Sequence, residues 1–207
     1  MGGTRSGFAI RGRRCISASN KKRNRGGLRE LCSRPMVAVG LCPRHDPRSM
    51  KDKHIAIRIE QCLALSKASN CPRRKFGALL LDPVRNAILM DGYNGGPRGG
   101  GALCGGHECL RDTLEVKSGT RMEVGCHHAE MNVICNAAAT GVACTGAWLI
   151  VTGEPCVLCA KLIHHAGIVR VLIVQGGYAG ENGVGYLEAH GVAVQRVDGP
   201  QDPRTLI

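Results

Sequence analysis

Three side chains suited to binding a metal lie in two short segments that the fold must bring together. The first segment is His128-Ala129-Glu130, and the second is Pro155-Cys156-Val157-Leu158-Cys159. A His and two Cys are ligands that zinc prefers, and three protein ligands leave one tetrahedral position open for water, whereas a structural site fills all four. The pattern therefore predicts an open zinc centre made of His128, Cys156 and Cys159, with a structural zinc site as the alternative.

Both segments are expected to begin helices. Cys156 and Cys159 are three residues apart, which places them on one face of a helix that Pro155 suits at its first position. Residues 129–139 are rich in Ala, Met, Val and Ile and lack Gly and Pro, which predicts a mostly buried helix. Glu130 is too close to His128 to bind the same ion, but it is well placed to touch a water there. We expect Glu130 to carry protons.

The remaining elements alternate between helix and strand after an opening hairpin. The sequence predicts an amphipathic helix over 53–69, a glycine-rich loop over 92–106, a short helix over about 107–116, and strands over 77–82, 86–91, 147–151, 169–174 and about 192–197. This order predicts an α/β fold, a three-layer α/β/α sandwich around a mixed sheet of about five strands. Both zinc-binding helices are expected on one face of the sheet.

The positive charge is concentrated in the first quarter of the chain. Residues 1–51 hold 13 Lys and Arg against 2 Asp and Glu, whereas residues 52–207 hold 15 against 14, a net charge of +1. An enzyme that acts on nucleic acid is expected to carry a basic surface on its folded domain. We therefore expect a folded domain over 52–198, a basic arm over 1–51 and a tail over 199–207, with no nucleic-acid binding except through the arm.

The basic arm has four interpretations. It has little helical or strand periodicity, which indicates disorder. It fits a nucleic-acid-binding tail, a nuclear localisation patch, an Arg-rich organelle presequence, or sequence upstream of the true start. We favour the last, because Met50 directly precedes the first predicted helix.

Cysteine use and hydropathy indicate where the protein works. The 12 Cys cluster near His residues and include the predicted zinc pair, which favours metal binding and free thiols over disulfides. The sequence has no secretory apolar region and no run of about 18 apolar residues that would span a bilayer. We expect a reducing, cytoplasmic location and no membrane partner.

The two metal segments together form the H-x-E and P-C-x-x-C signature of zinc-dependent nucleobase deaminases. Most of residues 52–198 resembles one family within the cytidine deaminase superfamily, the deoxycytidylate (dCMP) deaminases. The resemblance rests on Cys71 to Ala78, Gly92 to Gly99, His128 to Ile134, Pro155 to Lys161 and Ala166 to Ile168. It implies hydrolysis of dCMP to dUMP and ammonia, which supplies thymidylate synthesis, with zinc as cofactor and Glu130 as the proton shuttle.

Other members of the superfamily fit the sequence less well. Free-nucleoside cytidine deaminases usually have Cys where His128 stands, and riboflavin-pathway deaminases have a longer gap between their zinc Cys. The tRNA adenosine deaminases have a similar Pro-Cys-x-x-Cys helix, but the insertion between Asn94 and His128 and the neutral domain disfavour them.

Two further classes of function remain open. One is a non-catalytic, nucleotide-binding regulatory module, although such a module would not need Glu130. The other is editing of single-stranded nucleic acid, for which the aromatic content of 3% leaves little stacking surface.

The resemblance also implies contacts with the nucleotide. Asn94 would bind the sugar hydroxyl, and Tyr178 would contact the nucleotide. For the phosphate we expect basic side chains, since an Arg fork suits phosphate oxygens. The candidates are Arg73, Arg74, Lys75 and Arg98.

In many family members the glycine-rich loop forms an effector site between subunits, where dCTP with Mg²⁺ activates and dTTP inhibits. The matching residues here are Gly92, Asn94, Gly95 and Arg98. Glycines let backbone amides approach a phosphate closely. A site between subunits implies a homo-oligomer. A flexible loop without regulation is the alternative.

Five more potential metal ligands lie outside the zinc signature. They are Cys71, Cys104, His107, Cys109 and Cys126. Some phage and bacterial dCMP deaminases hold a second, structural zinc in this region, and four of these side chains would complete a tetrahedron. Unligated thiols are the alternative.

Overall fold

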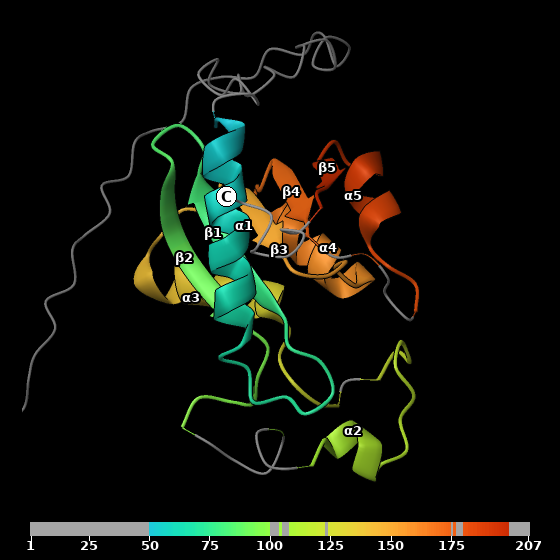
Figure 1. Ribbon diagram of the computed structural model, residues 1–207. Coiled ribbons are helices and arrows are strands. Elements are labelled where there is room, and N and C mark those ends of the chain that lie inside the picture. The colour runs from blue at the N-terminus through green and yellow to red at the C-terminus, as the bar shows by residue number, and fades with distance from the viewer. Residues whose placement is uncertain are drawn as a thin grey trace, which may run out of the picture. The chain divides into compact units, whose positions relative to one another are not determined.

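A mixed five-stranded sheet forms the centre of the protein. The computed structural model describes residues 50–99, 104, 108–122, 124–174, 176 and 180–198. The strands are β1 (Gly77–Asp82), β2 (Ala87–Tyr93), β3 (Trp148–Val151), β4 (Arg170–Ile173) and β5 (Ala193–Arg196), in the order β2-β1-β3-β4-β5 (Figure 1). β1 is antiparallel to both of its neighbours, whereas β3, β4 and β5 are parallel. The predicted mixed sheet is confirmed.

Helices cover both faces of this sheet. Helix α1 (Asp52–Ser66) packs on one face, and α3 (Ala129–Thr140), α4 (Val157–His165) and α5 (Val184–Ala189) pack on the other. The short α2 (Leu110–Thr113) belongs to the insertion between β2 and α3 (Figure 1). Both predicted zinc-binding helices therefore lie on the same face, and the three-layer architecture is confirmed. No helix in the described part of the chain has the length and apolar character needed to cross a bilayer.

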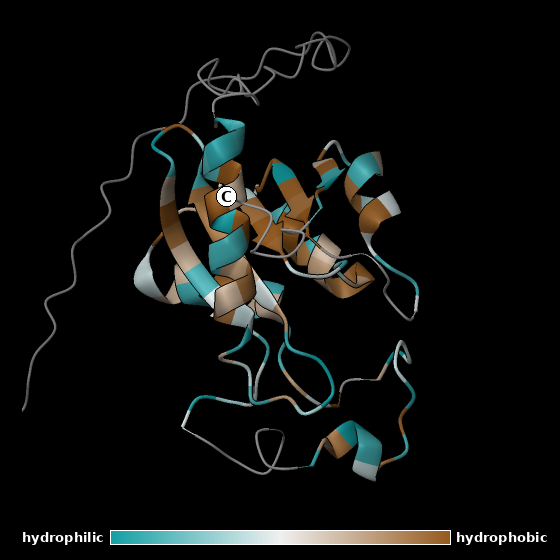
Figure 2. Ribbon diagram, in the orientation of Figure 1, coloured by the Kyte–Doolittle hydropathy of each residue, from teal (hydrophilic) through white to brown (hydrophobic). Residues whose placement is uncertain are grey.

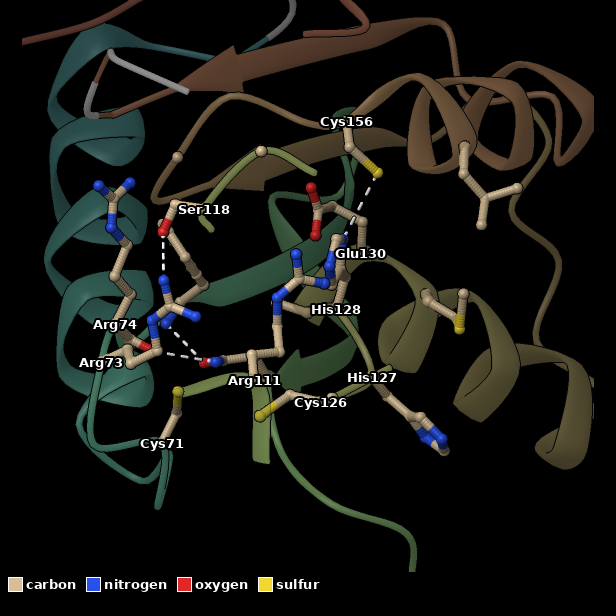
Figure 3. A pocket seen from close by; sticks show the side chains of 18 of the residues that line it. Cys71, Arg73, Arg74, Arg111, Ser118, Cys126, His127, His128, Glu130 and Cys156 are labelled. Carbon is tan, nitrogen blue, oxygen red and sulfur yellow. Dashed lines mark hydrogen bonds between the residues drawn. The ribbon is translucent and has the colours of Figure 1, made fainter. Parts of the chain in front are cut away.

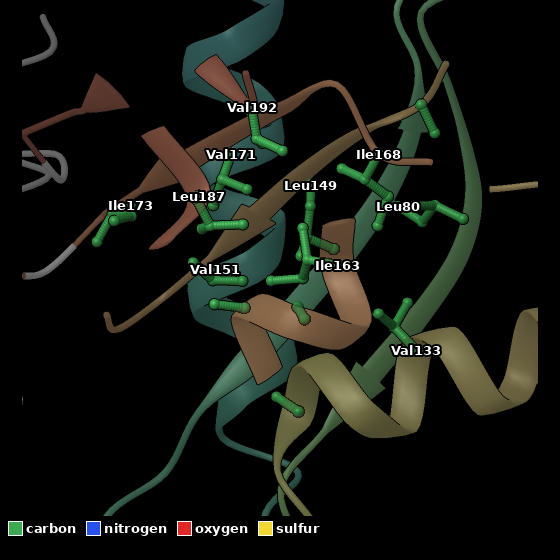
Figure 4. Close-up of a cluster of buried hydrophobic side chains, with 14 of the residues drawn as sticks. Leu80, Val133, Leu149, Val151, Ile163, Ile168, Val171, Ile173, Leu187 and Val192 are labelled. Carbon is green, nitrogen blue, oxygen red and sulfur yellow. The ribbon is translucent and has the colours of Figure 1, made fainter. Parts of the chain in front are cut away.

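The central strands are apolar on both sides because both of their faces are covered. In β3 the residues alternate, with Leu149 and Val151 in the larger apolar cluster under α3, α4 and α5, and Trp148 and Ile150 in the smaller cluster under α1 (Figure 4). All four are at most 2% exposed. Figure 2 shows the same strands as continuous apolar arrows. Such uninterrupted apolar runs are typical of strands buried on both faces.

Several predicted boundaries were wrong by a few residues, and one helix was missed. Strand β2 continues to Tyr93, so Gly92 belongs to the strand and not to the glycine-rich loop. Helix α4 begins at Val157 after Cys156 as its N-cap, so Pro155 precedes the helix instead of occupying its first position. The short helix predicted over 107–116 is confined to Leu110–Thr113. Helix α5 was not predicted, because Gly183 and Gly185 interrupt its sequence.

Only the end of the predicted arm and none of the predicted tail lie among the described residues. Of residues 1–51, the structure describes Met50 and Lys51, and residues 199–207 lie outside it. Met50 is buried against the smaller apolar cluster, with Ile59 and Cys62 of α1. The interpretations of the arm stay predictions.

Two glycines allow helices to approach the hairpin from opposite faces. A Cβ at Gly77 in β1 would lie 2.7 Å from the Cys62 carbonyl oxygen of α1. A Cβ at Gly92 in β2 would lie 2.7 Å from the Val133 amide nitrogen and 2.9 Å from the Ala129 carbonyl oxygen, both in α3. These neighbours are backbone atoms, which cannot rotate away. The missing side chain at Gly92 therefore sets how closely the helix that carries Glu130 packs on the sheet.

We expect Gly92→Ala to lower the free energy of unfolding by about 1–3 kcal/mol, because the added methyl group overpacks the contact between β2 and α3. Gly185→Ala is the matched control, since a Cβ there meets no atom within 4 Å and the position lies inside helix α5. Alanine should leave stability unchanged or raise it at that position. Urea unfolding of both variants measures the difference. Equal stability of the two variants would contradict the close approach at Gly92.

Candidate zinc centre and active-site pocket

The three predicted zinc ligands lie at the N-termini of two neighbouring helices. His128 is the N-cap of α3, and Cys156 is the N-cap of α4, with Cys159 in its first turn. The residues beside these ligands are fixed in the core, since Ala129 is 1% exposed and Ala160 is fully buried. The folding of the core therefore brings together the two segments that the sequence separates.

The ligand atoms fit a tetrahedral zinc ion. His128 Nδ1 lies 3.5 Å from Cys156 Sγ and 3.4 Å from Cys159 Sγ. All three ligand atoms lie within 4.8 Å of one another. Zinc bonds of about 2.0 Å to nitrogen and about 2.3 Å to sulfur, at a tetrahedral angle, would separate N and S by about 3.5 Å. The observed distances agree, and three ligands leave a fourth position for water.

The two thiols have opposite shifts in pKa. A hydrogen bond from the Cys159 thiol, assisted by His128, lowers the pKa of Cys156 to about 4 against the opposing effect of burial. The same contact with the Cys156 thiolate, together with burial, raises the pKa of Cys159. Cys156 Sγ also accepts a hydrogen bond from the Cys159 amide, at 3.5 Å, as the helix cap. A helix N-terminus stabilises such a thiolate, and a thiolate is the form that binds metal.

The Glu130 carboxyl is buried next to this centre. Its side chain lies in the pocket beside His128 and Cys156 (Figure 3), and the residue is 7% exposed. Burial raises the pKa of Glu130 above its usual value, and the charge of His128 only partly opposes this effect. A carboxylate with a raised pKa takes up a proton more readily than an ordinary one, which suits a general base.

The centre opens into a pocket of about 790 Å³. One wall comes from the compact fold and includes Arg73, Arg74, Phe76, Asn94 and the start of α4. The other wall comes from the insertion and includes residues 118–122 and 124–128. The insertion thus encloses the space in front of Glu130. A volume of this size is suited to a small molecule.

Asn94 lies in the pocket, where its side chain also fixes the neighbouring backbone. It is 5% exposed, its Oδ1 accepts a hydrogen bond from the Phe76 amide at 2.7 Å, and its Nδ2 donates one to the Arg74 carbonyl at 2.9 Å. An amide side chain has one further donor and one further acceptor site. Asn94 can therefore still bind a hydroxyl. Tyr178, the other predicted nucleotide contact, lies outside the described residues.

The predicted phosphate donors occupy different surroundings. Arg73 and Arg74 both line the pocket, whereas Lys75 and Arg98 lie outside its lining. The Arg73 guanidinium is committed to the insertion: Nε pairs with Asp112 at 3.2 Å, and the Nη atoms donate to the Val116 carbonyl and the Ser118 hydroxyl (Figure 3). Arg74 is exposed and makes no side-chain hydrogen bond to another described residue. The structure therefore favours Arg74 over Arg73 as a ligand for phosphate.

Arg111, which the sequence did not single out, organises the insertion. Its two Nη atoms donate hydrogen bonds of 3.0–3.2 Å to the carbonyls of Lys117, Thr120, Met122 and Val124. One side chain thereby holds most of the outer wall of the pocket. No pattern in the sequence marks this role, because each acceptor is a backbone atom.

Three of the five additional metal-ligand candidates lie together. Burial raises the pKa of Cys126, and the neighbouring thiols of Cys104 and Cys71 raise it further. Cys109 is 4% exposed and lines the same pocket as Cys71 and Cys126. His107 lies outside the described residues. The thiols of Cys71 and Cys104 thus lie near that of Cys126, but among the described residues only His128, Cys156 and Cys159 place three ligand atoms within 4.8 Å of one another.

The residues expected to bind an effector have partners of their own. Gly92 is buried in β2 against α3. Gly95 forms an isolated bridge with His127, through two backbone hydrogen bonds of 2.9 and 3.2 Å. Arg98 donates a hydrogen bond to the Asn136 side chain. Of the four residues, Asn94, Gly95 and Arg98 lie beyond the end of β2, and the Asn94 side chain lies in the active-site pocket.

The chain is similar to deoxycytidylate deaminases in sequence and in fold. It is 36% identical to the human deoxycytidylate deaminase over 114 residues, which is 55% of this chain and 60% of that protein. It is 32% identical to ComE operon protein 2 of Bacillus subtilis over 134 residues, which is 65% of this chain and 66% of that protein. A crystal structure of the dCMP deaminase from cyanophage S-TIM5, in complex with dCMP and dUMP, has a TM-score of 0.60 and 28% identity and covers 72% of this chain and 99% of that chain.

The chain spans less than two thirds of the length of the curated relatives from Bacillus subtilis, Schizosaccharomyces pombe and human. The family model described as the cytidine and deoxycytidylate deaminase zinc-binding region matches residues 51–175, which include His128, Glu130, Cys156 and Cys159. This match covers more than half of the chain and confirms the family that the sequence resembles. The chain belongs to the cytidine and deoxycytidylate deaminase zinc-binding family.

Proposed function

We propose that the protein hydrolyses dCMP to dUMP and ammonia, and so supplies dUMP for thymidylate synthesis. The observation that carries this proposal is the buried Glu130 carboxyl beside three converging zinc ligands, in a pocket bordered by an insertion. The relatives named deoxycytidylate deaminases support the choice of substrate, as does the cyanophage enzyme that binds dCMP and dUMP.

His128, Cys156 and Cys159 would hold the zinc. When bound, zinc supplies Lewis acidity, which brings the pKa of a coordinated water toward neutrality. Glu130 accepts a proton from the attacking water and returns protons to the ring nitrogen and to the leaving amine. The water oxygen ends on the ring carbon, and ammonia departs with the exocyclic nitrogen. The buried position of Glu130 supports this role, because its raised pKa eases the uptake of the proton from water.

The other groups of the nucleotide have candidate partners in the pocket. Asn94 would bind the sugar hydroxyl with the donor and acceptor that its backbone contacts leave over. The exposed guanidinium of Arg74 would meet the phosphate in a charge-assisted hydrogen bond. Tyr178 and Lys75 stay candidates from the resemblance alone.

A comparison of substrates tests the proposed function. We expect ammonia release from dCMP to exceed that from CMP, dCTP, deoxycytidine and tRNA. Release from deoxycytidine should be slower because deoxycytidine has no phosphate to contact the pocket. Initial rates at equal substrate concentration, with zinc-loaded protein, measure the preference. Faster release from tRNA would identify a nucleic-acid deaminase, and zinc-loaded protein that releases no ammonia from any substrate would identify a binding module.

Glu130→Gln tests the proton shuttle. An amide keeps the shape of the side chain but cannot take up a proton, so turnover should fall by about 10²- to 10⁴-fold while zinc content and fold are kept. Steady-state rates, zinc analysis and circular dichroism provide the three measurements. Glu188→Gln, at an exposed position of α5, is the matched control and should keep full activity. Activity of Glu130→Gln within tenfold of the wild type would remove Glu130 from the mechanism.

We also propose an effector site for dCTP with Mg²⁺ and for dTTP, in a homo-oligomer. The segment from Gly95 to Arg98 is its centre, because Gly92 is enclosed by α3 and the Asn94 side chain faces the active-site pocket. Arg98 contacts Asn136, and α3 begins at the zinc ligand His128. A nucleotide bound at Arg98 would thus act on the helix that carries Glu130.

A second, structural zinc at the base of the insertion is proposed from the thiol cluster. Cys71 and Cys104 both lie near Cys126, and Cys109 or His107 would supply the fourth ligand. Such a site would join the start of β1, the insertion and the start of α3. All nine cysteines in the described part of the chain are free thiols, which supports metal binding in a reducing compartment such as the cytoplasm.

Metal analysis tests this second site. We expect two zinc ions per chain, and we expect Cys126→Ser to lower the content to one and to loosen the insertion, because a hydroxyl replaces a thiolate ligand. Cys135→Ser, at an exposed position of α3, is the control and should keep both ions. A wild-type content of one zinc per chain would exclude the second site.

A further inference from the structure

The Asn132 and Asn136 side chains attach α3 to the edge strand β2. Asn132 Nδ2 donates to the Tyr93 carbonyl at 2.7 Å, and Asn136 Nδ2 donates to the Asp91 carbonyl at 3.1 Å. The two Asn are one helical turn apart, and the two acceptors are two residues apart in the strand. Because β2 is at the edge of the sheet, these carbonyls have no neighbouring strand to bind. Side chains of α3 therefore bind the carbonyls that a further strand would otherwise bind.

The contact at Gly92 completes this attachment. Gly92 lies between the two acceptors, where the Ala129 and Val133 backbone of α3 comes within reach of a Cβ. Three consecutive strand residues thus contact α3, and any slide of the helix along the strand would break both amide bonds. The register between α3 and β2 is therefore set by side-chain hydrogen bonds together with close packing.

The two carbonyls that Asn132 and Asn136 bind have different neighbours along β2. Tyr93 is followed directly by Asn94, whose side chain holds the Phe76 amide and the Arg74 carbonyl in the pocket wall. Asn132 is in turn two residues from Glu130. The bond from Asn132 to Tyr93 therefore joins the helix that carries the proton shuttle to the strand end that carries the proposed sugar contact. Asn136 binds farther back along β2, away from the pocket.

We propose that Asn132 is a positioning residue that sets the distance between Glu130 and a substrate held by Asn94. The inference rests on the proposed deaminase function of the pocket. A shift of about 1 Å between reacting groups can cost up to about 10²-fold in rate. Loss of this one bond should thus affect turnover much more than it affects stability.

Asn132→Ala and Asn136→Ala form a matched pair. Each removes an amide-to-carbonyl bond between the same helix and the same strand, both positions are half-buried, and Asn136 also loses its bond to Arg98. An effect through stability alone would therefore lower the activity of Asn136→Ala at least as much as that of Asn132→Ala. We expect the kcat of Asn132→Ala for dCMP to fall by about 10- to 100-fold at a similar Tm, and that of Asn136→Ala to stay within about twofold of the wild type without effector nucleotides.

Amide hydrogen exchange provides a readout that does not need catalysis. The Phe76 amide, which donates to Asn94, should exchange at least about tenfold faster in Asn132→Ala and be little changed in Asn136→Ala. Equal losses of kcat, or equal exchange rates, in the two variants would overturn the role of Asn132. If the wild-type protein deaminates no nucleotide, the proposed function fails, and the exchange comparison still decides whether Asn132 positions the strand end.

Discussion

The convergence of two helix N-termini on one face of the sheet is the constraint on which the site depends. His128 Nδ1 approaches the two sulfurs to 3.4 and 3.5 Å because α3, which packs on β2 and β1, lies beside α4 on the same face of the sheet. Small buried residues, Ala129 beside His128 and Ala160 beside Cys159, let both helices come close to the strands and to each other. Each ligand is thus adjacent in sequence to a residue that the core immobilises. The close packing of the core therefore fixes the positions of the candidate metal ligands.

The electrostatics of the site favour metal binding and proton transfer at the same place. A buried carboxyl and two neighbouring thiols would all be costly to ionise together without a cation between them. In the absence of metal the protons are shared, with Cys156 ionised and the pKa values of Cys159 and Glu130 raised. A divalent cation held by His128, Cys156 and Cys159 would favour the ionised form of both thiols. The proposed ligands and the proposed proton shuttle Glu130 therefore lie in one buried cluster.

Local sequence patterns predicted the fold, but no local pattern indicated where backbones approach each other closely. The apolar runs 77–82 and 147–151 predicted strands that the structure has at Gly77–Asp82 and Trp148–Val151, and the Ala-rich helix predicted over 129–139 is Ala129–Thr140. Gly92 was assigned to a loop because glycine is usually a turn residue, yet its use here is to admit the α3 backbone. The role of Asn132 was likewise hidden, since its acceptor is a carbonyl 39 residues away in sequence.

The arginines show why residue type alone assigned the phosphate contact poorly. The sequence suggested Arg73 because an arginine fork suits phosphate, but the same fork suits backbone carbonyls and a nearby carboxylate, and Arg73 spends its donors on Asp112, Val116 and Ser118. Arg111 does the same with four carbonyls. An insertion with few apolar side chains cannot be held by a core of its own, so guanidinium groups hold it instead. The neighbouring Arg74 is the arginine that remains available for a ligand. The shape of the insertion depends on Arg73 and Arg111, which need not contact the substrate.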